Sequence, residues 1–409
     1  MTLSGVDALA AAIKANDAAS VARVLEEHPG LKAHVDEPNP CGSFGQTALL
    51  AAVQRQNREM VDALLRAGAN INQKSHWWAG GFHVLDDAWQ TPWMASFLIG
   101  RGAVPEIHHV VRLGMIEDVR RMLSEDPALV HARGGDGQLP LHFAQTVEMA
   151  QFLLDRGADV NARDVDHEST AAQWMVRDRT AVARALVARG GATDILMAAA
   201  LGELEIATRL LDANPEVIGT TVSRTWFPMR DPRAGGSIYI WTLGAGKTAP
   251  VIAREFGHEE VFRVLMDRAP DGMRLATACE VGDEDLCRRL LAAHPGLAGT
   301  LTPDQLRKIA DAAQANNINA VRLMLEAGWP VDARGQHRAT PLHWAAFNGN
   351  AEMTRLLLAH HAPVHVRGDE FDATPLGWAT HGAEHGPNKA GDYVATSEAL
   401  QAAQNVPKS

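Results

Sequence analysis

The 409-residue chain has few cysteines and no excess of basic residues. Its three cysteines, Cys41, Cys279 and Cys287, show neither metal-site spacing nor the number that a disulfide framework needs. We therefore expect three small, buried thiols in a reducing compartment. Lysine and arginine number 38 against 49 acidic residues, a net charge of −11, and they form no basic block. That balance argues against nucleic acid and against an anionic membrane surface as partners.

Long apolar runs and signal sequences are also missing. No stretch approaches the roughly 18 apolar residues of a membrane span. Residues 1–17 lack a basic region followed by an apolar one, so they predict a first helix and a cytoplasmic protein. Phosphate-loop, dinucleotide and nucleophile-elbow motifs do not occur, so no cofactor is expected. Hydrophobic residues nevertheless make up 46% of the chain, which is enough for a continuous core.

What the sequence does have is an internal repeat. The clearest copy, residues 340–349, reads TPLHWAAFNG, and TPLGWA begins 34 residues later at Thr374. A third copy, QTALLAA, begins at Gln46. A period near 33 residues built on T-P-L-H-x-A resembles the ankyrin repeat. The resemblance implies an all-α solenoid whose units each contain a β-turn finger, an inner helix and an outer helix.

We predict about twelve such units in one continuous solenoid over residues 1–409. Each outer helix contains a largely apolar residue pair: Val24-Leu25, Leu64-Leu65, Phe97-Leu98, Met122-Leu123, Phe152-Leu153, Ala185-Leu186, Leu210-Leu211, Val264-Leu265, Leu290-Leu291, Met324-Leu325, Leu356-Leu357 and Ala399-Leu400. Glycines follow several outer helices, where a left-handed residue should end the helix: Gly68, Gly102, Gly157, Gly190 and Gly328. The last copy, residues 372–409, departs from the pattern and is expected to cap the array.

Two inserted fingers, residues 75–87 and 220–246, interrupt the period. They contain four of the ten tryptophans, and each has a Gly-Gly pair that allows a tight reversal. Because fingers project from the concave edge of an ankyrin-like array, we expect aromatic walls or lids there. In the second insertion, Arg230 and Arg233 lie near aromatic residues, which suits an anionic or ring-shaped ligand. A finger that simply packs on neighbouring repeats is the alternative.

Asp86 and Asp87 end the first insertion, where a repeat would have Leu-His. Trp78 and Trp89 are close in sequence, and an apolar wall would raise a carboxylate's pKa and make it a plausible acid or base. The alternative is ordinary negative charge at the start of a helix.

Residues 164–170, DVDHEST, form the densest polar cluster on a predicted finger. Asp166, His167 and Glu168 offer acid, base and metal-ligand chemistry. An extended hairpin would, however, send His167 to the side opposite the two carboxylates. A capped, solvated turn is the alternative.

Other histidines have weaker claims. His142 and His343 occupy the tetrapeptide position that in ankyrin repeats usually bonds backbone near the next finger, so we expect a structural role. His381 and His385 could chelate a metal on a helix, but the glycines that follow them favour a loop. We therefore predict no metal site.

These patterns favour a protein that recognises a partner protein through its concave face and aromatic fingers. The alternative is a cofactor-independent acid/base enzyme, a hydrolase, lyase or isomerase, acting on a small polar or anionic molecule in a pocket that the fingers enclose. The predicted catalytic residues are Asp87, Asp166, His167 and Glu168. The predicted ligand-binding residues are Trp78, Asp86, Trp89, Arg230, Arg233, Tyr239, Trp241, His337, Asp369 and Trp378.

Overall fold

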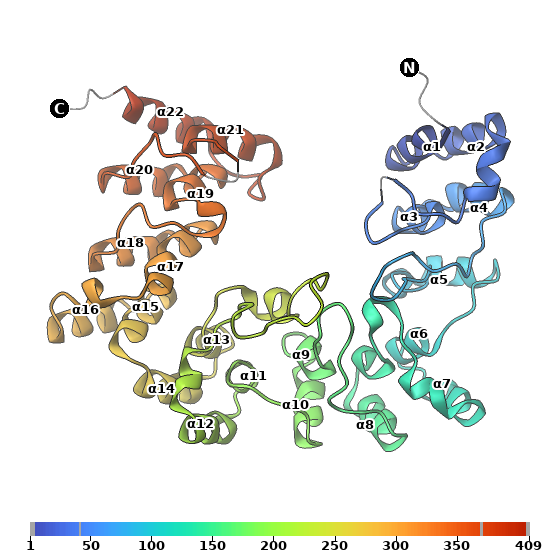
Figure 1. The fold of residues 1–409 in the computed structure, drawn as a ribbon, viewed down its shortest axis with the longest axis horizontal. Helices are drawn as coiled ribbons and strands as arrows, with labels where there is room; N and C mark the ends of the chain where they lie inside the picture. Colours follow the sequence, from blue (N-terminus) through green and yellow to red (C-terminus); the bar gives the residue numbers. More distant parts are fainter. Residues whose placement is uncertain (1–4, 41, 369–370, 406–409) are drawn as a thin grey trace. The chain divides into compact units, whose positions relative to one another are not determined.

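The computed structural model describes residues 5–40, 42–368 and 371–405. Over these residues the chain is helical and has no strand, which confirms the predicted all-α fold (Figure 1). It divides into two compact units: unit 1 is Met1–Leu201 with Thr221–Lys247, and unit 2 is Gly202–Thr220 with Thr248–Ser409. Cys41 and the predicted ligand-binding residue Asp369 lie outside the described residues.

Unit 1 is built from short helix pairs joined by fingers. Its α-helices are α1 (Gly5–Lys14), α2 (Ala18–Glu27), α3 (Ala48–Gln54), α4 (Arg58–Arg66), α5 (Pro92–Ile99), α6 (Ile107–Arg112), α7 (Ile116–Glu125), α8 (Val147–Asp155), α9 (Ala171–Met175), α10 (Thr180–Ala188) and α11 (Ile195–Leu201). Shorter helical turns are η1 (Pro29–His34), η2 (Ala88–Gln90), η3 (Pro127–His131), η4 (Gly135–Gly137), η5 (Pro140–Phe143) and the π-helical turn η7 (Ile240–Gly244).

Unit 2 repeats the same plan. Its α-helices are α12 (Leu204–Ala213), α13 (Ala249–Glu255), α14 (Glu259–Arg268), α15 (Asp271–Val281), α16 (Glu284–Ala293), α17 (Pro303–Gln314), α18 (Ile318–Ala327), α19 (Pro341–Phe347), α20 (Ala351–Ala359), α21 (Pro375–His385) and α22 (Tyr393–Gln404). Its shorter turns are η6 (Pro215–Gly219), η8 (Leu297–Thr300) and η9 (Gln336–Arg338). Among the described residues, no helix is long and apolar enough to cross a membrane.

Every predicted outer-helix pair lies in an α-helix, from Val24-Leu25 in α2 to Ala399-Leu400 in α22. Inner helices pack on inner helices and outer on outer, as α19 on α21 and α20 on α22. Where a unit is about three residues short, its inner helix is only a 3₁₀ turn, η2 or η5. The predicted glycine caps are left-handed, with φ of +99° at Gly68 and Gly328.

A buried histidine ties each of two inner helices to the next finger. Nδ1 of His343 accepts a hydrogen bond from Thr340 N (3.2 Å), and its Nε2 donates to Ala373 O (3.2 Å). In unit 1, His142 Nε2 likewise donates to Ser169 O (3.2 Å). Burial lowers the pKa of both imidazoles to about 4. The predicted structural role of these two histidines is confirmed.

The thiols of Cys279 and Cys287 are buried, with their sulfur atoms 3.6 Å apart. For these two residues the prediction of small core thiols is confirmed.

Candidate functional site

One position in the finger, three residues before the N-cap residue of the inner helix, lies at the tip of the turn. We call the residues at this position fingertip residues: Phe44, Asp136, His167, His337 and Phe371. The backbone turns back there through a left-handed residue, with φ of +55°, +56° and +56° at the first, second and fourth of these. At the other two the positive φ falls on the next residue along the chain. The side chain at the tip therefore projects from a fixed point of the scaffold.

In unit 1, two successive fingertips meet. Asp136, Asp166 and His167 each place one ligand-type atom within 4.8 Å of the others. His167 Nε2 lies 3.5 Å from Asp166 Oδ2. We call these three residues the unit 1 fingertip cluster.

The two inserted fingers hold this cluster in place. Trp77 Nε1, from the first insertion, donates to Asp136 Oδ1 (3.0 Å). From the second insertion, Gly235 N donates to Asp166 Oδ1 (3.2 Å), and Gly236 O accepts a hydrogen bond from His167 Nδ1 (2.9 Å). The insertions thus build a site out of two ordinary repeat fingers.

The sequence prediction that His167 points away from its neighbouring carboxylates is wrong for Asp166. The finger is a tight turn, not an extended hairpin, because Glu168 is left-handed (φ +44°). Glu168 does not belong to the cluster: its Oε1 accepts hydrogen bonds from the backbone amides of Arg230 (2.8 Å) and Asp231 (3.0 Å). It fastens the second insertion to the finger.

The cluster is polar but largely enclosed. Asp166 and His167 are buried, and the His167 ring lies edge-on to Trp174 and Trp241, at centroid distances of 5.2 and 4.9 Å. Burial raises the pKa of Asp136 to about 6, and repulsion from the Asp166 carboxylate contributes in the same direction. Two carboxylates and an imidazole in this setting favour a bound cation, either a proton or a metal ion.

The rest of the second insertion is anchored in the same way. Tyr239 is fully buried and donates to Asp194 Oδ2 (2.9 Å), which leaves it no surface for the predicted ligand. Arg233 forms a two-bond fork with Asp231 (3.0 and 2.7 Å) and stacks over Trp78, 4.2 Å from the ring centre. Trp241 remains 58% exposed.

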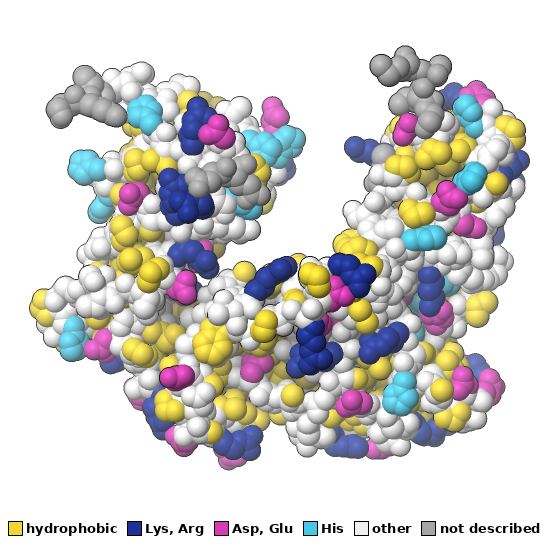
Figure 2. All heavy atoms as spheres, in the orientation of Figure 1, with side chains coloured by type: hydrophobic (Ala, Val, Ile, Leu, Met, Phe, Trp, Pro, Cys, Tyr) yellow, Lys and Arg dark blue, Asp and Glu magenta, His cyan; other side chains and the backbone are white. Residues whose placement is uncertain are grey.

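Beside the cluster lies an open recess of about 680 Å³, whose lining includes Arg133, Arg163 and Arg230. In Figure 2 the finger segments next to α9 show basic, acidic and hydrophobic side chains side by side. The predicted ligand-binding residue Arg230 lines this recess together with both basic and acidic residues.

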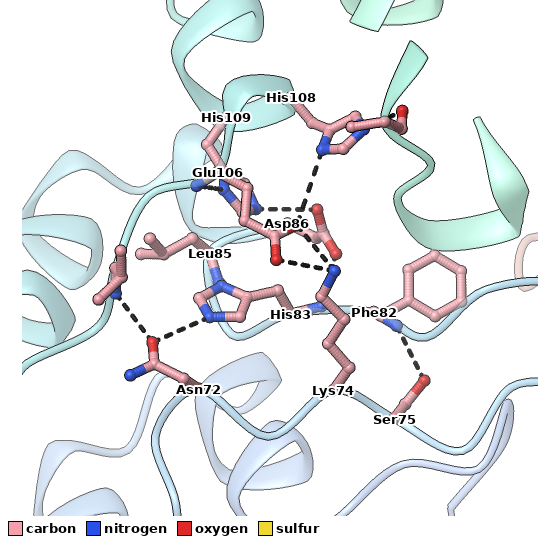
Figure 3. A network of polar contacts seen from close by, with 12 residues as sticks. Asn72, Lys74, Ser75, Phe82, His83, Leu85, Asp86, Glu106, His108 and His109 are labelled. Carbon is pink, nitrogen blue, oxygen red and sulfur yellow. Dashed lines mark hydrogen bonds and ion pairs between the residues drawn. The ribbon is translucent and has the colours of Figure 1, made fainter. Parts of the chain in front are cut away.

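Asp86 belongs to a separate polar network (Figure 3). Its carboxylate accepts from His83 N (2.6 Å) and His109 Nε2 (3.1 Å). Burial acts to raise the pKa of Asp86, but the hydrogen bonds from His109 and His83 and the nearby positive charge of Arg112 outweigh burial, so the pKa lies below its usual value. The expectation of a raised pKa is wrong for Asp86, because donors and not an apolar wall surround it.

The other two residues predicted in this region lie at the surface. Asp87 is exposed and accepts from Gln54 Nε2 (3.1 Å). Trp89 is 40% exposed, with the Arg112 guanidinium 5.6 Å from its ring centre. Neither residue is placed in the unit 1 fingertip cluster.

Unit 2 brings its fingertips together in a different kind of site. A pocket of about 460 Å³ is lined by His337, Trp344, Phe347, Phe371, Ala373, Gly377, Trp378 and His381. The two indoles meet edge to face, with centroids 5.0 Å apart at 87°, and Phe371 lies 5.8 Å from the Trp378 ring. We call this the aromatic pocket. It contains His337 and Trp378, both predicted to bind a ligand.

The loop predicted around His381 and His385 is wrong, because α21 runs through both histidines. Gly382 is there for close packing: a Cβ would lie 2.4 Å from the Phe347 carbonyl oxygen. The two imidazoles are therefore one turn apart, 4.7 Å between ring centres, and Figure 2 shows histidine side chains at the surface beside α21.

Sequence reasoning missed Asp136 and most of the aromatic pocket, and it included Asp164 in the polar run 164–170 without giving it a role. The repeat itself contained a signal for some of these residues, because Asp136, His337 and Phe371 share the fingertip position. Trp344 and Trp378 also share one position in successive inner helices, four residues after Thr340 and Thr374. Nothing in the repeat marked Asp164, which accepts from His167 N (2.5 Å) and Trp174 Nε1 (2.6 Å).

Comparison with known proteins identifies the repeat. The family model "Ankyrin repeats (3 copies)" matches residues 309–386, and "Ankyrin repeat" matches residues 44–76 and 136–165. The E3 ubiquitin-protein ligase KEG of Arabidopsis thaliana is 25% identical over 337 residues, which is 80% of this chain and 17% of that protein. Palmitoyltransferase Hip14 of Drosophila melanogaster is 40% identical over 99 residues, 24% of this chain and 15% of that protein.

The chain thus spans less than a fifth of the length of either relative. A crystal structure of the human ASB11 ankyrin repeat domain aligns with 75% of this chain and 100% of that chain, at 17% identity and a TM-score of 0.28. The family matches cover the copies that begin at Thr340 and Thr374 as well as the two fingers that carry Phe44 and Asp136. Residues 44–76, 136–165 and 309–386 of the chain are therefore ankyrin repeats.

Proposed function

We propose that this chain binds a partner protein and that the aromatic pocket of unit 2 is the main anchor point. Binding of proteins is the function that a surface of ankyrin repeats supports in general. The observation that carries the proposal is the pocket itself: about 460 Å³ of space lined mainly by aromatic and imidazole rings. Pockets of this kind hold the hot-spot side chains of a partner.

The residues that line the aromatic pocket indicate which kind of partner side chain it would hold. The walls are rings that meet edge to face, so the pocket suits an aromatic or large aliphatic side chain that completes the cluster. Phe371 is 59% exposed at the rim, where an incoming side chain would cover it. The inserted fingers of unit 1 offer a second contact surface, since Trp226 and Trp241 are 43% and 58% exposed.

A second function, acid/base catalysis on a small polar molecule, has less support from the geometry. Of the four residues proposed to be catalytic, only Asp166 and His167 belong to one cluster. The Glu168 carboxylate is bonded to two backbone amides, and Asp87 bonds Gln54.

The test compares two exposed fingertips. Peptides selected from a display library against the full chain should share an aromatic or large aliphatic residue. Phe371→Glu should lower their affinity at least tenfold, about 1.4 kcal/mol. Phe44→Glu is the matched control, because Phe44 has the same repeat position and is 51% exposed. Equal losses in both variants, or no loss in Phe371→Glu, would contradict the proposal.

A further inference from the structure

Two histidines in unit 1 face carboxylates, but they carry the proton on opposite ring nitrogens. His109 Nδ1 accepts a bond from Glu106 N (2.8 Å), so its Nε2 carries the proton and donates to Asp86. His167 is the reverse: its Nδ1 donates to Gly236 O (2.9 Å). In the neutral ring, Nε2 of His167 is therefore a lone pair, 3.5 Å from the Asp166 carboxylate. Two acceptors that face each other repel unless a proton, a hydrogen-bond donor or a metal ion bridges them.

Each carboxylate of the cluster uses one oxygen atom for a hydrogen bond to an inserted finger. Asp166 Oδ1 accepts from Gly235 N, and Asp136 Oδ1 accepts from Trp77 Nε1. Each ligand-type residue therefore has an outer partner that fixes its orientation. Metal-binding histidines and carboxylates are typically oriented by such outer bonds, and a backbone carbonyl on the second histidine nitrogen is among the usual ones.

The fingers are held together independently of any ion. The backbone amides of Val165 and Asp166 donate to Asp136 O (2.9 and 3.1 Å), which joins the two fingertips. The Asp164 carboxylate accepts from His167 N and Trp174 Nε1 and so fixes the turn that presents His167. The scaffold is therefore in place before a ligand arrives.

We propose that Asp136, Asp166 and His167 bind one divalent transition-metal ion. One imidazole and two carboxylates suit Zn²⁺ or Mn²⁺, with water in the remaining positions. The ligand atoms lie within 4.8 Å of one another. A metal at about 2.1 Å from each would bring them to roughly 3.4 Å, so the most distant pair would close by up to about 1.4 Å on binding. The inserted fingers, which supply the outer bonds, are the parts that position the ligands.

The experiment is a titration of the full chain, stripped with chelator and dialysed, with ZnCl₂ or MnCl₂ alone, followed by calorimetry. We expect one ion per chain. Asp136→Asn and His167→Gln should each lower the affinity at least tenfold. Tryptophan fluorescence gives a second readout with CoCl₂, because the Trp241 ring is 4.9 Å from His167 and should be quenched only when the cluster is intact.

The matched control is His381→Ala with His385→Ala, which removes two histidines that lie one helical turn apart and outside the cluster. That variant should bind the metal like the original chain. Thermal melts establish that each variant is folded. Loss of binding in the His381/His385 variant with retention in Asp136→Asn would overturn the proposal. So would the absence of saturable uptake by the original chain.

Discussion

The fingertips of unit 1 and unit 2 share a scaffold position and differ in chemistry. In unit 1 the position holds the exposed Phe44 and, further along the chain, Asp136 and His167, which are enclosed by the inserted fingers. In unit 2 it holds His337 and Phe371, which line an apolar pocket and stand 5.3 Å apart between ring centres. The comparison teaches that the repeat fixes where a side chain is displayed, while the residue at that point decides what it can bind.

In both units a buried histidine hydrogen-bonds the backbone of the next finger and so supports the fingertip residues. Removing this histidine is the change with the largest expected effect on stability. His142→Ala and His343→Ala each leave a buried backbone amide without its partner, remove one of the two hydrogen bonds to a carbonyl of the next finger, and open a cavity. We expect each to lower the free energy of unfolding by about 2–4 kcal/mol. Urea denaturation followed by circular dichroism measures it. A loss in one unit only would show that the support is not shared.

Acid should weaken both units through the same histidines. In the folded chain the pKa of His142 and of His343 is about 4, against 6.5 for an ordinary histidine. The folded state therefore favours the neutral form: its stability is fully present above pH 6.5 and is lost as the pH falls toward 4. Between pH 7 and 5 we expect a loss of about 2 kcal/mol per histidine. His343→Gln should remove about that much of the pH dependence, and an unchanged dependence would contradict the assignment.

Asp86 and Asp87 are adjacent carboxylates in different surroundings. Replacing each of them tests the polar contacts of unit 1, with a smaller expected effect on stability. Asp86→Ala leaves buried donors on His83 and His109 unpaired, which should cost about 1–3 kcal/mol. Asp87 is exposed, and Asp87→Ala should change stability by less than about 0.5 kcal/mol. Thermal and urea unfolding of both variants measure the difference. Equal effects would mean that the Asp86 network is not what holds the first insertion.

The repeat predicted the helices well because its apolar pairs recur with the period. Val24-Leu25 and Ala399-Leu400, the first and last pairs, both lie in outer helices. The end of α21 was missed because Gly382 was interpreted as a loop residue. Its true constraint is the close approach of the Phe347 carbonyl, a contact between residues 35 positions apart that local propensity does not contain.

The site was predictable only in part for the same reason. The polar run at residues 164–170 drew attention to Asp166 and His167. Asp136 stands 30 residues earlier, and only the stacking of two fingers brings it to them. The orientation of His167 depends on Gly236 O, 69 residues away, so neither the period nor the spacing indicates which ring nitrogen is available.

The most direct test of the claim that fingertip residues decide what each unit binds is diffraction from crystals of the full chain grown with ZnCl₂, measured at the zinc absorption edge. The account predicts an anomalous peak bounded by Asp136, Asp166 and His167, with no metal in the aromatic pocket. A map without that peak, or with zinc only at His381 and His385, would contradict it.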